Sequence, residues 1–155
     1  MLNNDIFRRL RYTFDWSDQE MIKIFSLAEA EVELPKIHAW LKKEDAEGFQ
    51  SMHDIHLARF LNGFIVQKRG RKEGPLPTPE KQLNNNLILR KLKIALELKD
   101  DDLIEVLKKA DFRISKPELS AFFRKPDHKH FRLAKDQVLR NFIFGLQLTN
   151  KPNSQ

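Results

Sequence analysis

The sequence predicts an all-α fold of two tandem homologous four-helix repeats joined by a Pro/Gly-rich linker. Three observations support this prediction. The chain resembles itself at an offset of 82 residues, each copy carries apolar residues at helical spacing, and residues 68–80 between the copies contain two Gly and three Pro. The 155 residues are 41% hydrophobic, which suffices for two small cores.

The internal duplication covers residues 3–66 without a gap. It contains 17 identities, whereas chance would give about four at ordinary residue frequencies. The first-copy members of the identical pairs are Asn3, Asn4, Ile6, Arg8, Leu10, Asp18, Ile22, Ala28, Pro35, Ala39, Lys43, Asp45, Phe49, Asp54, Leu57, Phe60 and Gly63, each matched 82 positions later.

The first helix of each copy is expected to start at a pair of asparagines and to run over about residues 4–15 in the first copy. Asparagine suits an N-cap because its short side chain accepts a hydrogen bond from an orphan backbone N–H. The apolar stripe is Ile6, Leu10 and Phe14 in the first copy and Ile88, Leu92 and Leu96 in the second.

The second and third helices are expected to begin at caps. Ser17 and Glu20 have capping-box spacing, as do Ser115 and Glu118, and Asp100 is the expected cap of the second helix in the second copy. The third helices each carry a proline in the first turn, at positions 35 and 117, where a missing N–H costs little. Their bulky residues are expected in the core (Ile37, Trp40, Leu41, Leu119, Phe122 and Phe123).

The fourth helix is expected to start near Asp54 and Asp136 as N-caps, and it contains Gly63 and Gly145. A glycine inside a helix costs roughly 1 kcal/mol relative to alanine. Its presence in both copies predicts a close approach by another helix backbone. The predicted organisation is a first repeat over 1–67, a basic linker over 68–84, a second repeat over 85–148 and a flexible tail over 149–155.

Charge is distributed unevenly around the net +6. Residues 3–66 hold 8 Lys or Arg against 11 Asp or Glu, whereas residues 85–148 hold 14 against 9. The chain has no cysteine, which excludes disulfides, thiolate metal sites and a cysteine nucleophile. No signal peptide and no apolar run of about 20 residues is visible, so we expect a cytoplasmic protein with no membrane partner.

The most polar shared segment follows the third helix. Phe122–Phe131 reads as two bulky apolar residues, two cations, any residue, Asp, three residues and Phe, and Trp40–Phe49 repeats this pattern. The shared part is typical of a structural corner: a helix end, a turn and an aromatic anchor into the core. Asp45 and Asp127 are expected to pair with a neighbouring lysine or to cap the turn.

The second copy adds cations to this corner, which raises the hypothesis of phosphate-backbone binding to DNA or RNA. A second cluster lies at the start of the linker. The candidate contacts are Arg124, Lys125, His128, Lys129, His130, Arg132, Lys68, Arg69, Arg71 and Lys72. A helix-turn-helix motif is disfavoured because the connection from residue 28 to 35 is longer than the usual turn.

Enzyme motifs are absent, so no catalytic residue and no cofactor are predicted. The pairs His53/His56 and His128/His130 have no counterpart in the other copy, and no metal site is predicted from them. The competing hypothesis is a protein-interaction adaptor or a homodimer, because two helical units of opposite net charge can dock on a partner or on each other.

With these motifs in view, the chain resembles the YehS-like bacterial family, whose members carry two copies of the domain of unknown function number 1456. The residues that carry the resemblance are Asn85, Asn86, Arg124, Lys125, Asp127, His128, Lys129, Phe131, Asp136 and Gly145, with Asn3, Asn4, Lys42, Lys43, Asp45, Phe49, Asp54 and Gly63 in the first copy. The resemblance implies a bacterial source and a cytosolic setting. It supplies no substrate and no catalytic residue.

Overall fold

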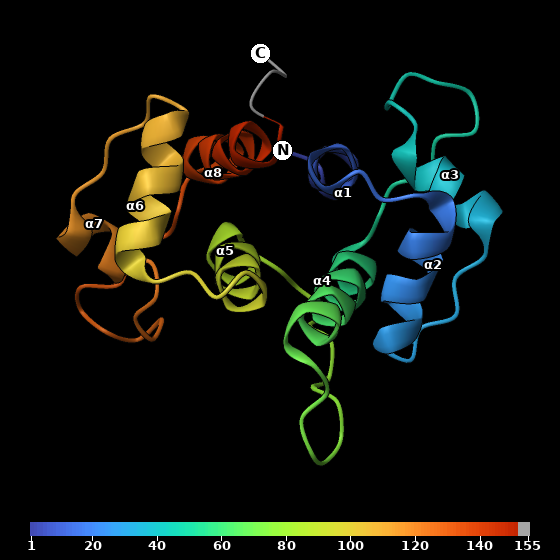
Figure 1. Ribbon diagram of the computed structural model, residues 1–155, viewed down its shortest axis with the longest axis horizontal. Helices are drawn as coiled ribbons and strands as arrows, with labels where there is room; N and C mark the ends of the chain where they lie inside the picture. Colours follow the sequence, from blue (N-terminus) through green and yellow to red (C-terminus); the bar gives the residue numbers. More distant parts are fainter. Residues whose placement is uncertain (152–155) are drawn as a thin grey trace. The chain divides into compact units, whose positions relative to one another are not determined.

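The computed structural model describes residues 1–151, and these form eight helices and no strand. The chain divides into two compact units, Met1–Leu83 and a second unit from Asn84 onward. Each contains four helices (Figure 1), so the predicted all-α tandem architecture is confirmed. The helices are α1 Asn3–Phe14, α2 Asp18–Leu27, α3 Leu34–Leu41, α4 Asp54–Arg69, α5 Asn85–Ala95, α6 Asp100–Lys109, α7 Lys116–Ala121 and α8 Asp136–Asn150.

The core of the first unit is aromatic. The ring of Phe60 on α4 lies 4.9 Å from that of Phe7 and 5.0 Å from that of Phe25, and all three side chains are fully buried. The Phe7 and Phe60 rings meet edge to face, and such packing adds to the hydrophobic contribution of each ring. The second unit has Leu89 in place of Phe7 and Leu107 in place of Phe25, and both leucines are fully buried. The duplicated fold therefore tolerates two different core compositions.

Two predicted capping boxes are confirmed. Ser17 accepts from the Glu20 N–H at 3.2 Å, and Ser115 accepts from the Glu118 N–H at the same distance. Hydrogen bonding by the Ser115 side chain, and then by its backbone N–H, lowers the pKa of the Glu118 carboxylate. These boxes fix where α2 and α7 begin.

Three predicted aspartate caps are wrong by one residue. The N-caps of α4, α6 and α8 are His53, Lys99 and Lys135, and each expected aspartate is instead the first helical residue. The carboxylates of Asp54 on α4 and Asp136 on α8 each accept a hydrogen bond from an asparagine of their own unit. Asp54 accepts from the Asn3 side chain at 2.7 Å, and Asp136 accepts from its counterpart Asn85 at 2.9 Å. This second bond lowers the pKa of Asp136.

The glycine prediction is confirmed in both units. A Cβ atom added at Gly63 would overlap the carbonyl oxygen of Ile24 on α2, and one added at Gly145 would overlap that of Val106 on α6. These two helix pairs, α2 with α4 and α6 with α8, are the most closely packed in their units. Glycine is required here by the approach of the neighbouring backbone.

The linker begins later than the sequence predicted. Helix α4 continues through Lys68 and Arg69, because nothing breaks its hydrogen-bond pattern before Gly70, whose φ of 79° ends it. The far end of the linker is attached to the first unit, since the Leu83 N–H donates to the Asp54 carboxylate at 2.8 Å. At the other end of the chain, α8 extends through Asn150, two residues into the predicted tail, and residues 152–155 of that tail lie outside the described residues.

Candidate nucleic-acid interface

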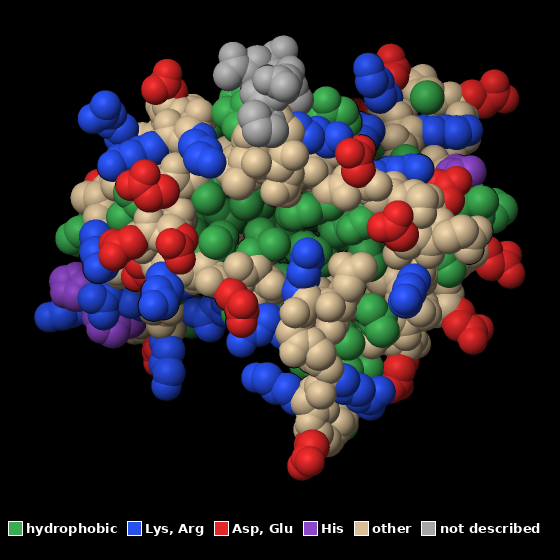
Figure 2. Space-filling view, viewed as in Figure 1, with side chains coloured by type: hydrophobic (Ala, Val, Ile, Leu, Met, Phe, Trp, Pro, Cys, Tyr) green, Lys and Arg blue, Asp and Glu red, His purple; other side chains and the backbone are tan. Residues whose placement is uncertain are grey.

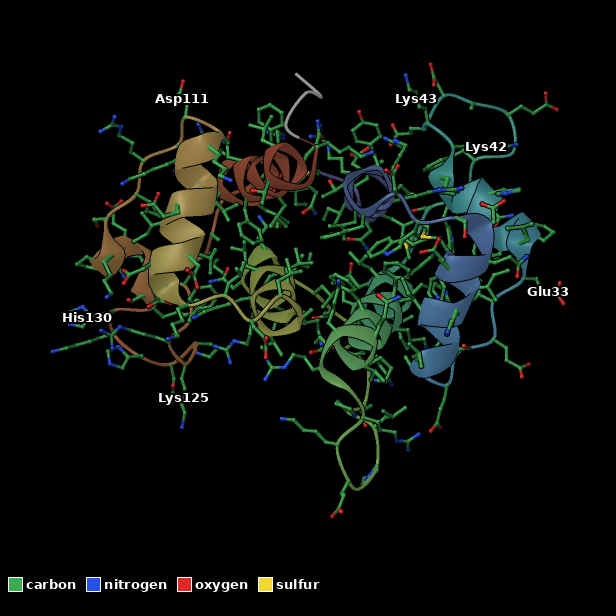
Figure 3. All side chains as sticks on the ribbon, in the orientation of Figure 1. Glu33, Lys42, Lys43, Asp111, Lys125 and His130 are labelled. Carbon is green, nitrogen blue, oxygen red and sulfur yellow. The ribbon has the colours of Figure 1, made fainter. Side chains whose placement is uncertain are left out.

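The candidate interface is the loop between α7 and α8 in the second unit. We call Arg124, Lys125, His128, Lys129, His130 and Arg132 the basic corner; all six side chains are exposed. Figure 2 shows Lys, Arg and His side chains gathered at the left of the view, where Figure 1 places this loop. Figure 3 shows Lys125 and His130 pointing away from the helices. The structure thus brings together six of the ten predicted contacts.

A buried asparagine holds both ends of this loop. The Asn86 side chain, 5% exposed, donates to the Phe122 carbonyl at 3.0 Å and to the Arg132 carbonyl at 2.8 Å, and it accepts from the Ala134 N–H at 2.9 Å. Three of its four hydrogen-bonding positions are therefore used on the backbone of one loop. The expected capping role of this asparagine is wrong, because Asn84 caps α5 instead.

The backbone of the loop is further closed by two internal turns. The His128 N–H donates to the Lys125 carbonyl at 2.9 Å, and the Phe131 N–H donates to the His128 carbonyl at 2.9 Å. The Arg132 N–H then returns to the Ala121 carbonyl at the end of α7. The expected aromatic anchor is present but only half-buried at Phe131. A loop closed in this way presents its side chains from a defined position.

Within the corner, Arg124 and His128 place two hydrogen-bond donors side by side. His128 accepts the His130 N–H on Nδ1 at 3.0 Å. A neutral imidazole has one acceptor nitrogen, so this bond assigns the ring proton to Nε2. Nε2 lies 3.4 Å from the Arg124 Nη1, which is a donor in every state. An oxyanion between them would accept from both.

Other charged side chains of the corner divide into free and engaged groups. The side chains of Lys125 and Lys129 form no hydrogen bond or ion pair with residues 1–151. Asp127 likewise pairs with no described residue, so the expected pairing or capping role of this aspartate is wrong. Arg132 donates to the carbonyl of Phe131 at 2.8 Å and therefore supports the loop itself.

The equivalent corner of the first unit keeps the backbone frame and uses its cations differently. Asn4 makes the same three bonds, to Trp40, Gln50 and Met52. However, Lys42, the counterpart of Arg124, folds back to donate to the Glu47 carbonyl at 2.9 Å (Figure 3). Over residues 40–53 there are two Lys against three acidic residues, whereas 122–135 holds five Lys or Arg against one Asp.

The four predicted contacts of the linker cluster belong to the first unit. Lys68 lies over the Phe64 ring, with its Nζ 6.0 Å from the centroid, and Arg71 pairs with Glu29 at 3.1 Å. Arg69 has a partner within the protein, whereas Lys72 is exposed and without one among residues 1–151. This cluster is therefore partly engaged in the structure of its own unit.

Metal-ligating side chains do not gather within residues 1–151. The rings of the pair His128 and His130 lie 5.5 Å apart, and those of His53 and His56 lie 6.3 Å apart. No group of three His, Cys, Asp or Glu side chains forms in the described part of the chain. Among the same residues, no helix has the length and apolar character needed to cross a bilayer.

Sequence reasoning missed the residues that position the corner. Arg90 donates to the Phe123 carbonyl at 2.7 Å, and Asn85 donates to the Ala134 carbonyl at 2.9 Å, in addition to the role of Asn86. All three are identical between the copies at offset 82. A polar side chain that is identical in both copies, while its neighbours differ, was the available signal.

Two helical units built on the same asparagine-held loop define a tandem-repeat, all-helical protein. The chain belongs to the family described as protein of unknown function (DUF1456), whose model matches residues 3–70 and 85–151. An uncharacterized protein, YehS, of Escherichia coli (strain K12) is 47% identical over 147 residues, which cover 94% of this chain and 94% of that protein. The predicted family resemblance is confirmed. No solved structure matches the chain significantly.

Proposed function

We propose that this protein is a non-enzymatic, cytoplasmic binding module whose basic corner holds the phosphate backbone of a nucleic acid. One observation carries the proposal: Arg124 Nη1 lies 3.4 Å from His128 Nε2, which is assigned as a second donor because Nδ1 accepts the His130 N–H. The same loop carries the unpaired side chains of Lys125 and Lys129. Arginine is suited to phosphate because its planar fork matches the oxygens of that group. The contacts are with phosphate, so the proposed binding is independent of base sequence.

Electrostatics supports binding by the second unit in particular. The corner carries an excess of cations, and its counterpart in the first unit carries an excess of acidic groups. Cations on an exposed loop neutralise phosphates and release their counterions, which drives association.

The test is fluorescence anisotropy with labelled duplex DNA and with single-stranded RNA at low ionic strength. Reversing Arg124, Lys125 and Lys129 to Glu is expected to weaken binding at least tenfold, since three phosphate contacts are replaced by repulsion. These residues are exposed and bear no core contact, so the helical signal should be retained.

A control of equal charge comes from elsewhere on the surface. Lys23, Lys109 and Arg113 are exposed and have no hydrogen-bond or ion-pair partner for their side chains within residues 1–151. Each substitution by Glu removes one positive charge and adds one negative charge. Either triple variant therefore takes the formal net charge from +6 to zero. The proposal requires the corner variant to lose far more affinity than this control. Equal losses, or no binding by the unaltered protein to either nucleic acid, would overturn it.

A further inference from the structure

The first unit contains a hollow of 480 Å³ between the loop that follows α2, helix α3 and helix α4. Its apolar lining includes Ala30 and Val32 from the loop and Trp40, whose ring is almost fully buried. His56 lies against that ring, with centroids 4.9 Å apart. This volume is within the range that holds a small organic molecule, and the mixed apolar and polar lining is typical of such sites.

Ala30 lines the hollow with a small side chain. The N–H of Ala30 donates to the Phe25 carbonyl at 3.0 Å, and the N–H of its counterpart Phe112 donates to the Leu107 carbonyl at 3.0 Å. The two backbones are therefore held at the same point of the fold. The second unit places a large ring at the position where the first has a methyl group, so the fold accepts phenylalanine there.

Two cations face the hollow. Lys36 on α3 donates to the Gln50 side chain at 2.7 Å, and the side chain of Arg59 on α4 forms no hydrogen bond or ion pair with residues 1–151. Burial, together with the nearby charges of Arg59, His53 and Lys36, lowers the pKa of His56. The potential at this ring is thus positive, and an arginine without a partner is available for an anion.

The second unit lacks this set of side chains. Glu118, Val138 and Asn141 occupy the positions of Lys36, His56 and Arg59. The duplicated fold therefore does not need the two cations or the imidazole for stability. Their presence in the first unit, next to the space left by a small residue, points to a ligand.

Acidic side chains on the loop limit what that ligand can be. Glu31 and Glu33 line the hollow and are exposed, and Figure 3 shows Glu33 on the segment that leads into α3. Glu29 lines it too and pairs with Arg71 at 3.1 Å. Carboxylates around an opening disfavour a doubly charged phosphate group by repulsion, and they disfavour a singly charged carboxylate less. They also oppose entry of a nucleic acid.

We propose that this hollow is a binding site for a small carboxylate with a planar apolar ring. The carboxylate would pair with Arg59 and Lys36, and the ring would lie against Val32, Trp40 and His56. The proposal concerns the first unit, so it stands independently of phosphate binding at the basic corner.

The experiment is a titration of the full chain with benzoate, in a buffer without carboxylates, followed by NMR of the His56 ring and the Trp40 indole. Saturable shifts of both are expected with benzoate. Neutral benzamide and dianionic phenyl phosphate should bind at least about tenfold more weakly, because each loses or opposes the charge-assisted pairing. Equal binding of benzamide, or no saturable shift with benzoate, would overturn the proposal.

Two substitutions install the residue that the second unit has at the equivalent position. Ala30→Phe should abolish the shifts by filling the hollow, and Arg59→Asn should weaken benzoate binding about tenfold. Arg113→Asn, an exposed arginine of the second unit, is the control and should change nothing. Should Ala30→Phe lose helical signal, Arg59→Asn decides the outcome. Unchanged benzoate affinity in a folded Arg59→Asn protein contradicts the assignment.

Discussion

At the scale of single residues, the two buried asparagines are the most informative side chains in the molecule. Asn4 and Asn86 each tie together three backbone groups that lie 36 to 48 residues away in the sequence. A buried backbone group without a partner is costly, so one side chain that satisfies three of them fixes a loop that would otherwise be open.

Asn86→Ala is expected to destabilise the protein by about 3 kcal/mol, since it leaves two carbonyls and one N–H buried without partners. Urea unfolding followed by circular dichroism measures this free energy. Asn141→Ala is the control, because that side chain donates only to the Gln137 carbonyl one turn earlier. The control should stay within about 0.5 kcal/mol of the original protein. A similar small effect for both variants would contradict the role given to Asn86.

His56 gives a prediction for pH. Its pKa is lowered in the folded protein, so the unfolded chain binds the proton first as the pH falls. Stability is therefore lost as the pH drops below 6.5, the ordinary pKa of histidine, toward the lower pKa of the folded state. His56→Val, which installs the residue of the second copy, should remove this part of the loss. Urea unfolding at about pH 5 and about pH 8, followed by tryptophan fluorescence, tests it. Identical pH dependence in both proteins would show that His56 is not responsible.

At the scale of the helix, the duplicated glycines decide how closely two helices pack. Gly63 and Gly145 face a carbonyl oxygen of the neighbouring helix at the same place in each unit. The sequence predicted this approach because a glycine inside a helix has to be explained by something other than helix propensity. It did not predict the N-cap positions of α4, α6 and α8, because a side chain that suits a cap was used for another bond.

Gly145→Ala is expected to destabilise the second unit by about 2 kcal/mol, because the added methyl group overlaps the Val106 carbonyl and forces α6 and α8 apart. The sign is diagnostic, since alanine stabilises an unconstrained helix by about 1 kcal/mol relative to glycine. Circular dichroism during urea unfolding gives the measurement. A variant more stable than the original protein would mean that the helices do not meet at this point.

At the scale of the whole molecule, the two copies share their structural frame and differ in the side chains that they expose. The frame of each unit, with its asparagine-held loop and glycine contact, is the same in both copies. The exposed side chains on that frame differ: the first unit has the hollow with Lys36 and Arg59, and the second has the basic corner. For binding at the corner, the slope of log affinity against log salt should fall in magnitude by about three in the triple reversal with duplex DNA.

The candidate site was only partly predictable from the sequence. The clustering of cations between Arg124 and Arg132 is visible as a run of residues, and six of the ten predicted contacts do lie on one loop. What could not be predicted is which of them are free. Hydrogen bonds to backbone carbonyls engage Arg132, and an ion pair engages Arg71, and both depend on the folded path of the chain.

The fold class and the duplication follow from the sequence alone, because helical periodicity and an offset of 82 residues are properties of the order of residues. The family was inferred from a resemblance in motif residues, such as the paired asparagines, and the match of the family model bears it out. Tertiary structure decided the roles of the shared polar side chains. Asparagine is a residue type that suits an N-cap, yet Asn86 lies where three backbone groups of a distant loop meet. Satisfying these three groups stabilises the fold more than capping one helix would. The hollow beside Arg59 likewise exists only because folding brings a small loop residue, an α3 lysine and an α4 arginine together.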